Sequence, residues 1–183
     1  MAIRNRYELV YTLQRGAVCA EVGVEHGGFS ALLLEHSSPR ELHLIDSWSS
    51  ATPKFQKKQD FRYVYVLNRF KKEILEGRVL VHRKTSESAL GLFPDEFFDW
   101  VYLDGSVDPR IVHCDIFGYF KKVKKHGRLV VAGYSDDYRH TARYKTVREL
   151  LSSNPSASII ATTPHGKWAG HCVISKSRTE SEC

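Results

Sequence analysis

Residues 17–30, AVCAEVGVEHGGFS, constrain the fold more than any other stretch of the chain. The short apolar run at 17–20 indicates a buried strand, which ends at Glu21. A glycine turn (Gly23, Gly27, Gly28) follows, and the apolar stretch 29–35 favours a helix. A strand, a glycine turn and a helix in this order are typical of the first βαβ unit of a Rossmann-like α/β fold, in which the backbone approaches a ligand closely.

The spacing of the glycines argues against a dinucleotide ligand. A pyrophosphate-binding turn has the pattern G-x-G-x-x-G, but here Val24, Glu25 and His26 separate Gly23 from Gly27. Bulky side chains narrow this turn, and an acidic one repels phosphate. An NAD-dependent dehydrogenase is therefore disfavoured. A ligand without phosphate, held by its sugar and its amino-acid end, fits the turn better.

Three motifs resemble one enzyme family. EVGVEHGGFS is followed by LHLIDSW at 42–48 and by YLDGS at 102–106. Together they resemble the class I S-adenosylmethionine-dependent methyltransferases, and in particular a small branch with E-V-G-x-x-x-G-x-F-S, I-D-x-W and D-G-S-H motifs. The resemblance runs from about Arg6 to about Lys176. It implies an α/β, Rossmann-like three-layer sandwich with a mostly parallel seven-stranded sheet and an antiparallel last strand.

The resemblance implies S-adenosylmethionine as cofactor. Asp46 ends an expected strand at 41–45 and lies 25 residues beyond Glu21, so its carboxylate is expected to accept the ribose hydroxyls; a turn or helix-cap role is the alternative. Trp48 is expected either to cover the adenine or to pack in the core. Ser86 is expected to contact the adenine or to cap a helix. The expected cofactor residues are Glu21, Gly23, Val24, Gly27, Phe29, Ser30, Asp46, Ser47, Trp48, Ser86, Asp104 and Gly105.

The acceptor side departs from the resembled pattern. The apolar run 98–103 predicts a central strand that delivers Asp104 to the ligand crevice. The family continues with a histidine and an aromatic residue, where this chain has Val107 and Pro109. The remaining candidates for a general base are Asp104, Tyr134 and Asp136, assigned from position alone. Asp104 is a single carboxylate, which is too few ligands for Mg²⁺ or Ca²⁺, so we expect no metal.

The length of 183 residues suits one domain, expected to span 1–176 with an N-terminal helix at 4–15 and a flexible tail at 177–183. No stretch approaches the roughly 20 apolar residues of a membrane span, and the charged N-terminus is unlike a secretory signal. We therefore expect a cytoplasmic protein. The four scattered cysteines favour buried free thiols over a zinc site or a disulfide framework.

Other segments show ordinary helix and strand signals. The clearest helix is expected at 60–76, where apolar residues recur every three or four positions until Gly77. The polar stretch 49–58 contains Pro53 and is expected to be a loop on the substrate side, with at most one helical turn. Further helices are expected at 111–125 and 140–153. Strands are expected at 79–82 and 128–132, and at 158–162 and 170–175 around a turn at 164–167.

Positive charge is concentrated in two segments. Residues 54–84 hold ten Lys or Arg against three acids, and 121–125 reads KKVKK, whereas the whole chain has a formal net charge of +6. Such an excess serves nucleic acid or an acidic substrate or, more often, is a solvated helix face.

The resemblance implies methyl transfer, which we expect to reach an oxygen or nitrogen of a small-molecule acceptor. A cofactor-binding protein that has lost catalysis, an RNA-directed methyltransferase and an RNA-binding protein stay open, as does the oligomeric state.

Overall fold

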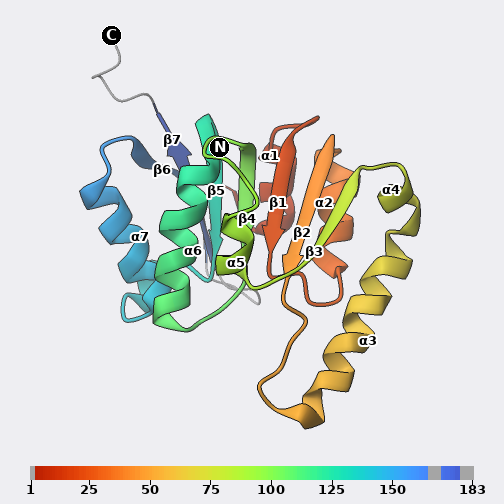
Figure 1. Ribbon diagram of the computed structural model, residues 1–183. Helices are drawn as coiled ribbons and strands as arrows, with labels where there is room; N and C mark the ends of the chain where they lie inside the picture. The colour runs from red at the N-terminus through yellow and green to blue at the C-terminus, as the bar shows by residue number, and fades with distance from the viewer. Residues whose placement is uncertain (1–2, 165–169, 178–183) are drawn as a thin grey trace.

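A computed structural model describes residues 3–164 and 170–177 (Figure 1). Seven strands form one sheet in the order β3-β2-β1-β4-β5-β7-β6. Their bounds are β1 Val18–Val22, β2 Glu41–Asp46, β3 Val79–Arg83, β4 Phe98–Leu103, β5 Val123–Ala132, β6 Ala157–Thr163 and β7 His171–Lys176. The pairs from β3 to β5 are parallel, and β7 runs antiparallel to both of its neighbours. This arrangement confirms the predicted fold class and its antiparallel last strand.

Helices cover both faces of the sheet and complete the three layers (Figure 1). Their bounds are α1 Arg6–Thr12, α2 Gly28–Ser37, α3 Pro53–Arg69, α4 Lys71–Leu75, α5 Ser86–Leu90, α6 Pro109–Lys122 and α7 Ala142–Ser153, with a short 3-10 helix at Asp136–Tyr138. Strand side chains alternate between the faces. Val101 therefore packs in one core with α5, α6 and α7, whereas Trp100 and Tyr102 pack in another with α1, α2 and α3.

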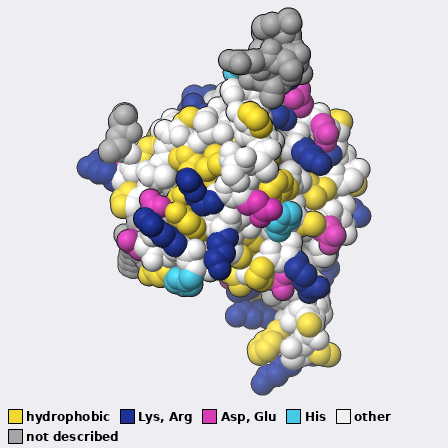
Figure 2. Space-filling model, turned by 90° about the vertical axis from the view of Figure 1, so that its left-hand side faces the viewer, with side chains coloured by type: hydrophobic (Ala, Val, Ile, Leu, Met, Phe, Trp, Pro, Cys, Tyr) yellow, Lys and Arg dark blue, Asp and Glu magenta, His cyan; other side chains and the backbone are white. Residues whose placement is uncertain are grey.

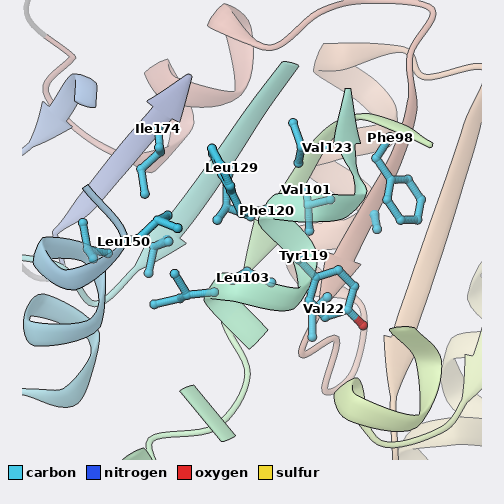
Figure 3. Packing of buried hydrophobic residues seen from close by; sticks show 14 of the residues in the cluster. Val22, Phe98, Val101, Leu103, Tyr119, Phe120, Val123, Leu129, Leu150 and Ile174 are labelled. Carbon is cyan, nitrogen blue, oxygen red and sulfur yellow. The ribbon is translucent and has the colours of Figure 1, made fainter. Parts of the chain in front are cut away.

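The core on the α6 and α7 face is continuous across the sheet (Figure 3). Phe98, Val101 and Leu129 lie on the strands, and Tyr119 and Phe120 of α6 pack over them. All five are almost completely buried. Fully burying one such side chain contributes about 1.5–3 kcal/mol, so this layer holds β4 and β5 rigidly beneath the loops that follow them.

The N-terminal helix is shorter than the predicted range 4–15. Asn5 caps α1, since its side-chain oxygen accepts hydrogen bonds from the backbone N–H groups of Tyr7 and Glu8. The helix ends where Leu13 adopts an extended conformation. Gly16, with φ of +66°, belongs to the turn before β1 and does not cap the helix. The predicted tail at 177–183 lies outside the described residues apart from Ser177.

The loop predicted at 49–58, with room for one helical turn, extends only to Thr52. Helix α3 already begins at Pro53, with Thr52 before it. Proline has no N–H to leave unpaired at the first turn of a helix, so Pro53 starts the helix rather than preventing it. The predicted single helix at 60–76 is also divided at Phe70 into α3 and α4. Of the cysteines, Cys19 and Cys172 are buried as expected, but Cys114 is exposed.

Candidate functional site

A cavity of about 830 Å³ lies at the carboxyl ends of β1, β2 and β4. This edge is where open parallel sheets bind their ligands, because the loops after neighbouring strands meet there. Nine of the residues predicted to bind the cofactor line the cavity: Glu21, Gly23, Val24, Phe29, Asp46, Ser47, Ser86, Asp104 and Gly105. Residues that are distant in the sequence are thus brought together on one surface.

The glycine turn forms a floor that no larger residue could form. Gly23 has φ of +90°, and a Cβ added there would lie 2.5 Å from the carbonyl oxygen of Asp104. Its N–H donates to the carbonyl of Ile45, and the N–H of Asp104 donates to the carbonyl of Val22. The ends of β1, β2 and β4 are therefore tied together directly beneath the cavity.

Glu21 is a buried carboxyl group at the end of β1. Its side chain is 1% exposed and accepts a hydrogen bond from the hydroxyl of Ser30 on α2. Burial raises the pKa of Glu21 to about 8, and the hydrogen bond from Ser30 opposes this rise. At neutral pH this carboxyl group therefore keeps its proton unless a positive charge enters the cavity.

Asp46 organises the loop that follows β1. Its Oδ2 accepts hydrogen bonds from the N–H groups of Val24 and Glu25, each 3.0 Å long. Its Oδ1 accepts one from the N–H of Trp48, 2.8 Å long. A carboxylate offers about four acceptor positions, so Oδ1 retains capacity for one further donor facing the cavity.

Asp104 lies at the end of β4 with 42% of its side chain exposed in the cavity. The surrounding walls remove water and raise its pKa, whereas the positive charges of Arg143 and Arg6 lower it. Arg143 reaches the same loop from α7. Its Nη2 donates to the carbonyl oxygens of Gly105 at 3.0 Å and Ser106 at 3.1 Å, and its Nη1 lies 3.8 Å from Asp104 Oδ1.

Five predicted site residues lie outside the cavity wall. Trp48 is 1% exposed, donates from Nε1 to the carbonyl of Glu25 and packs against Tyr63, so the packing alternative describes its place. Ser30 and Gly27 are behind the wall. The Ser30 hydroxyl donates to Glu21, and Gly27, with φ of +74°, lies against the ring of Phe70.

The predicted bases Tyr134 and Asp136 are not brought to the cavity. Tyr134 is 4% exposed, stacks on Tyr144 and belongs to the core on the α7 face. Asp136 starts the short 3-10 helix after β5 and is exposed. The loop after β5 leads away toward α7, because β7 pairs with the end of β5 and the N–H of Tyr134 donates to the carbonyl of Gly170.

Two arginines at the site were not predicted from the sequence. Arg6 of α1 lines the cavity, and its guanidinium lies 5.1 Å from the ring centre of Phe29. Arg143 comes from α7 and crosses Gly133, where a Cβ would lie 2.2 Å from its Nη1. The glycine after β5 could have indicated this contact from the sequence, since a glycine at a strand end often marks a close approach by another part of the chain.

Ser86 is the first residue of α5, and the cap is its neighbour Thr85, whose side chain accepts from the N–H of Ser88. Burial raises the pKa of Asp115, a buried acid on α6, to about 6, and the nearby Ser86 hydroxyl opposes this rise. Within the described ranges, no cluster of three or more His, Cys, Asp or Glu side chains is arranged to hold a metal ion. Nor does any helix there combine the length and hydropathy needed to cross a membrane.

Comparison with known proteins identifies a methyltransferase domain. The family model of a methyltransferase domain matches residues 20–134. A candidate rRNA methylase from Clostridium thermocellum has a similar structure, with 13% identity, 98% of this chain and 99% of that chain covered, and a TM-score of 0.68. Among curated proteins, none matches the sequence significantly.

Two further solved structures share the fold. The N-methyltransferase NodS from Bradyrhizobium japonicum is 17% identical, with 94% and 95% of the two chains covered and a TM-score of 0.64. A candidate methyltransferase from Streptococcus mutans, crystallised with S-adenosylhomocysteine (SAH), is 10% identical, with 93% and 95% covered and a TM-score of 0.63.

Proposed function

Since the chain belongs to the methyltransferase-domain family, we propose that it binds S-adenosylmethionine in the cavity and transfers the methyl group to a small-molecule acceptor. The observation that carries the proposal is the convergence of three carboxyl groups, those of Glu21, Asp46 and Asp104, around a glycine turn with no room for a Cβ. The cofactor carries a sulfonium and an ammonium group, and buried or half-buried carboxylates attract such cations.

The residues fit this cofactor by their chemistry. Asp46 retains acceptor capacity at the end of β2, which suits the ribose hydroxyls. Glu21 lies beside the glycine turn and suits the ammonium group, while the guanidinium of Arg6 suits the carboxylate at the same end. Ser86 and Ser47 line the part of the wall that suits the adenine. The solved Streptococcus mutans structure contains SAH, which supports the same choice of ligand.

The cofactor supplies an activated methyl group whose leaving group is a neutral thioether. The chain therefore needs above all to hold the acceptor in line with that methyl, which gains rate through proximity and orientation. Asp104 is the group in the cavity best suited to take the proton of a hydroxyl acceptor, because its raised pKa makes it a better base than an ordinary aspartate. Arg143 positions Asp104 by holding the carbonyls of the next two residues.

A small acceptor is supported by the lining of the cavity. Tyr7, Ser106 and Ile111 add aromatic, polar and apolar side chains to the charged residues of the wall. The acceptor atom is an oxygen or a nitrogen. An amine would need less help from Asp104 than a hydroxyl, since it is already nucleophilic.

An RNA acceptor is the second candidate, favoured by the basic segment 54–84 and by structural neighbours that are described as a candidate rRNA methylase and a Bacillus subtilis tRNA methyltransferase. Loss of catalysis is the third. Val107 and Pro109 motivated it. Pro109 also has a structural explanation, because Asp108 caps α6 and Pro109 occupies its first turn.

The test is methyl transfer by the full chain. S-adenosylmethionine is incubated with a panel of small hydroxyl and amine compounds and, separately, with total RNA, and SAH is quantified by mass spectrometry. The expected result is turnover with a small molecule and at least a roughly hundredfold lower kcat in Asp104→Asn with a hydroxyl acceptor. Turnover with RNA but with no small molecule would show that the acceptor is RNA and contradict a small-molecule acceptor. Cofactor binding without transfer to any acceptor would establish the lapsed alternative.

A further inference from the structure

Helix α3 projects beyond the carboxyl edge of the sheet (Figure 1). One side of the helix is fixed to the body of the protein. Val66 is buried, Tyr63 packs against Trp48 with ring centres 5.1 Å apart, and Arg62 forms an ion pair of 2.6 Å with Glu25 of the glycine turn. The opposite side of the helix faces solvent. Because the contacts on the inner side hold the helix in place, the outer side is positioned before any partner binds.

The solvent side carries large apolar side chains. Phe61, Val64 and Tyr65 are all exposed on this side, and Phe61 is the most exposed of them at 70%. The rings of Phe61 and Tyr65 lie 6.5 Å apart at 29° to one another. These three residues are neighbours on one face of a single helix, whereas exposed apolar residues are usually scattered singly over a protein surface.

Basic side chains alternate with the aromatic residues. Lys54, Lys57 and Lys58 precede Phe61, and Arg69 follows Tyr65; all four cations are exposed. The acid of this helix, Asp60, is paired with Arg83 of β3 and so does not neutralise the neighbouring lysines. The lowest part of the molecule, where α3 begins, shows hydrophobic and basic side chains side by side (Figure 2).

The second basic cluster has a different environment. In KKVKK at 121–125, Val123 is buried, Lys122 pairs with Asp95 at 2.7 Å and Lys124 pairs with Asp99 at 2.8 Å. Two of its lysines therefore stabilise the fold. This contrast separates α3 from an ordinary solvated charge run and provides a matched control.

The mixture of apolar and basic side chains on the outer face of α3 favours one kind of binding partner over the others. A helix that lies on a membrane segregates its apolar and basic faces, but here the two kinds alternate on one face. A second copy of the chain would bring like charges together across the contact. A single-stranded nucleic acid has what both kinds of side chain bind: phosphates for the lysines, and flat bases that stack on exposed aromatic rings.

We propose that the outer face of α3, from Lys54 to Arg69, is a docking surface for single-stranded RNA. Bases stack on Phe61 and Tyr65, and Lys57 and Lys58 contact the phosphates on either side. The helix is linked to the cavity wall by the ion pair of Arg62 with Glu25, which lines the cavity. The inference deepens the second candidate function by giving the RNA a site, and it concerns binding alone.

The test is fluorescence anisotropy of a labelled 20-nucleotide oligouridine with the full chain in the absence of cofactor. We expect Phe61→Ala/Tyr65→Ala to bind at least roughly tenfold more weakly than wild type, because stacking contributes about 1–3 kcal/mol per base. Lys57→Gln/Lys58→Gln should lower the slope of log K against log salt by about 1.4, since each phosphate that is no longer neutralised accounts for about 0.7. Lys121→Gln/Lys125→Gln and Tyr11→Ala, an exposed aromatic on α1, should bind like wild type.

Three outcomes would overturn the inference. Wild type with no affinity for the oligouridine at about 50 mM salt is the first. Equal affinity of wild type and both α3 variants is the second, since RNA would then dock elsewhere. The third is binding to anionic phospholipid vesicles, or dimerisation in sedimentation, that the α3 variants lose while RNA binding stays. Calorimetry with S-adenosylmethionine on the same variants separates these results from a failure of the proposed function, because the α3 changes should leave cofactor affinity unchanged.

Discussion

The two sides of β4 differ at the carboxyl edge of the sheet. Toward β1 and β2, a glycine turn leaves a cavity of about 830 Å³. Toward β5, the side chain of Arg143 fills the corresponding space, and the remaining hollow measures about 10 Å³. The strands on both sides are buried and parallel, so the side chains of the loops decide which side is open to a ligand.

The two sides also differ in how burial acts on their titratable groups. Glu21 on the open side keeps its proton, since burial raises its pKa and disfavours a carboxylate. His171 of β7, 3% exposed on the filled side, is held neutral, and burial lowers its pKa to about 4. Desolvation thus keeps both groups uncharged: Glu21 on the open side stays protonated until a cation binds, and His171 on the filled side stays unprotonated.

The largest expected effect comes from closing the open side. Gly23→Ala should reduce affinity for S-adenosylmethionine more than about a hundredfold, because the added Cβ collides with the backbone of Asp104 and the residue must keep a φ of +90°. Calorimetric titration measures the affinity, and circular dichroism verifies folding. Gly77→Ala is the matched control, since it has φ of +71° and open space. Equal losses in both variants would mean that strain alone is responsible.

Opening the filled side should cost stability. Arg143→Ala removes two hydrogen bonds to loop carbonyls from a side chain that is 15% exposed, and we expect a loss of about 2–3 kcal/mol in the free energy of unfolding. Urea denaturation measures it. Arg148→Ala, an exposed arginine on the same helix, should change stability by less than about 0.5 kcal/mol. A kcat that stays at the wild-type value would contradict the positioning role of Arg143.

Acid should weaken the filled side. The pKa of His171 is about 4 in the folded protein and 6.5 in the unfolded chain, so protonation favours the unfolded chain. The contribution of neutral His171 to the free energy of unfolding is therefore complete above pH 6.5 and declines as the pH falls toward 4. At pH 5 we expect the loss from this residue to be about 2 kcal/mol. Urea denaturation from pH 7 to pH 5 tests this, with a shallower decline expected in His171→Gln. An identical decline would assign the acid sensitivity to other groups, such as His43.

The smallest effect concerns the proton on Glu21. Cation binding favours the charged form of a group whose pKa is about 8 in the empty cavity, so affinity for S-adenosylmethionine should rise with pH. We expect about tenfold tighter binding at pH 8 than at pH 6. Calorimetry in buffers of different ionisation enthalpy also measures the protons released. Glu21→Gln should remove most of this dependence, and an unchanged pH profile in that variant would assign the linkage elsewhere.

The sequence predicted the open side well because its signals are local. Buried parallel strands are continuous apolar runs, and Gly23, Asp46 and Asp104 lie at or directly after the ends of such strands. In such a fold, the residue that follows the carboxyl end of a parallel strand lies at the edge of the sheet where the ligand binds. These local signals, together with the resemblance of the three motifs to the methyltransferase family, predicted the fold class and nine residues of the cavity wall.

The filled side was poorly predicted because it depends on long-range packing. Arg143 is a polar residue on an amphipathic helix, and nothing nearby in the sequence indicates that it reaches 38 positions back to Gly105. Tyr134 and Asp136 were placed by analogy with a strand end, but pairing of β5 with β7 directs that loop away. The start of α3 was missed because residues 54–59 lack an apolar period, and tertiary contacts of Tyr63 and Val66 hold the helix.

Calorimetric titration of the full chain with S-adenosylmethionine and with SAH tests the central claim most directly, on wild type and on Asp46→Ala. The predicted result is one ligand per chain with micromolar affinity for both compounds, and at least a roughly tenfold loss in the variant while circular dichroism shows an unchanged fold. Wild type that remains folded and binds neither compound would contradict the account, as would equal affinity in Asp46→Ala.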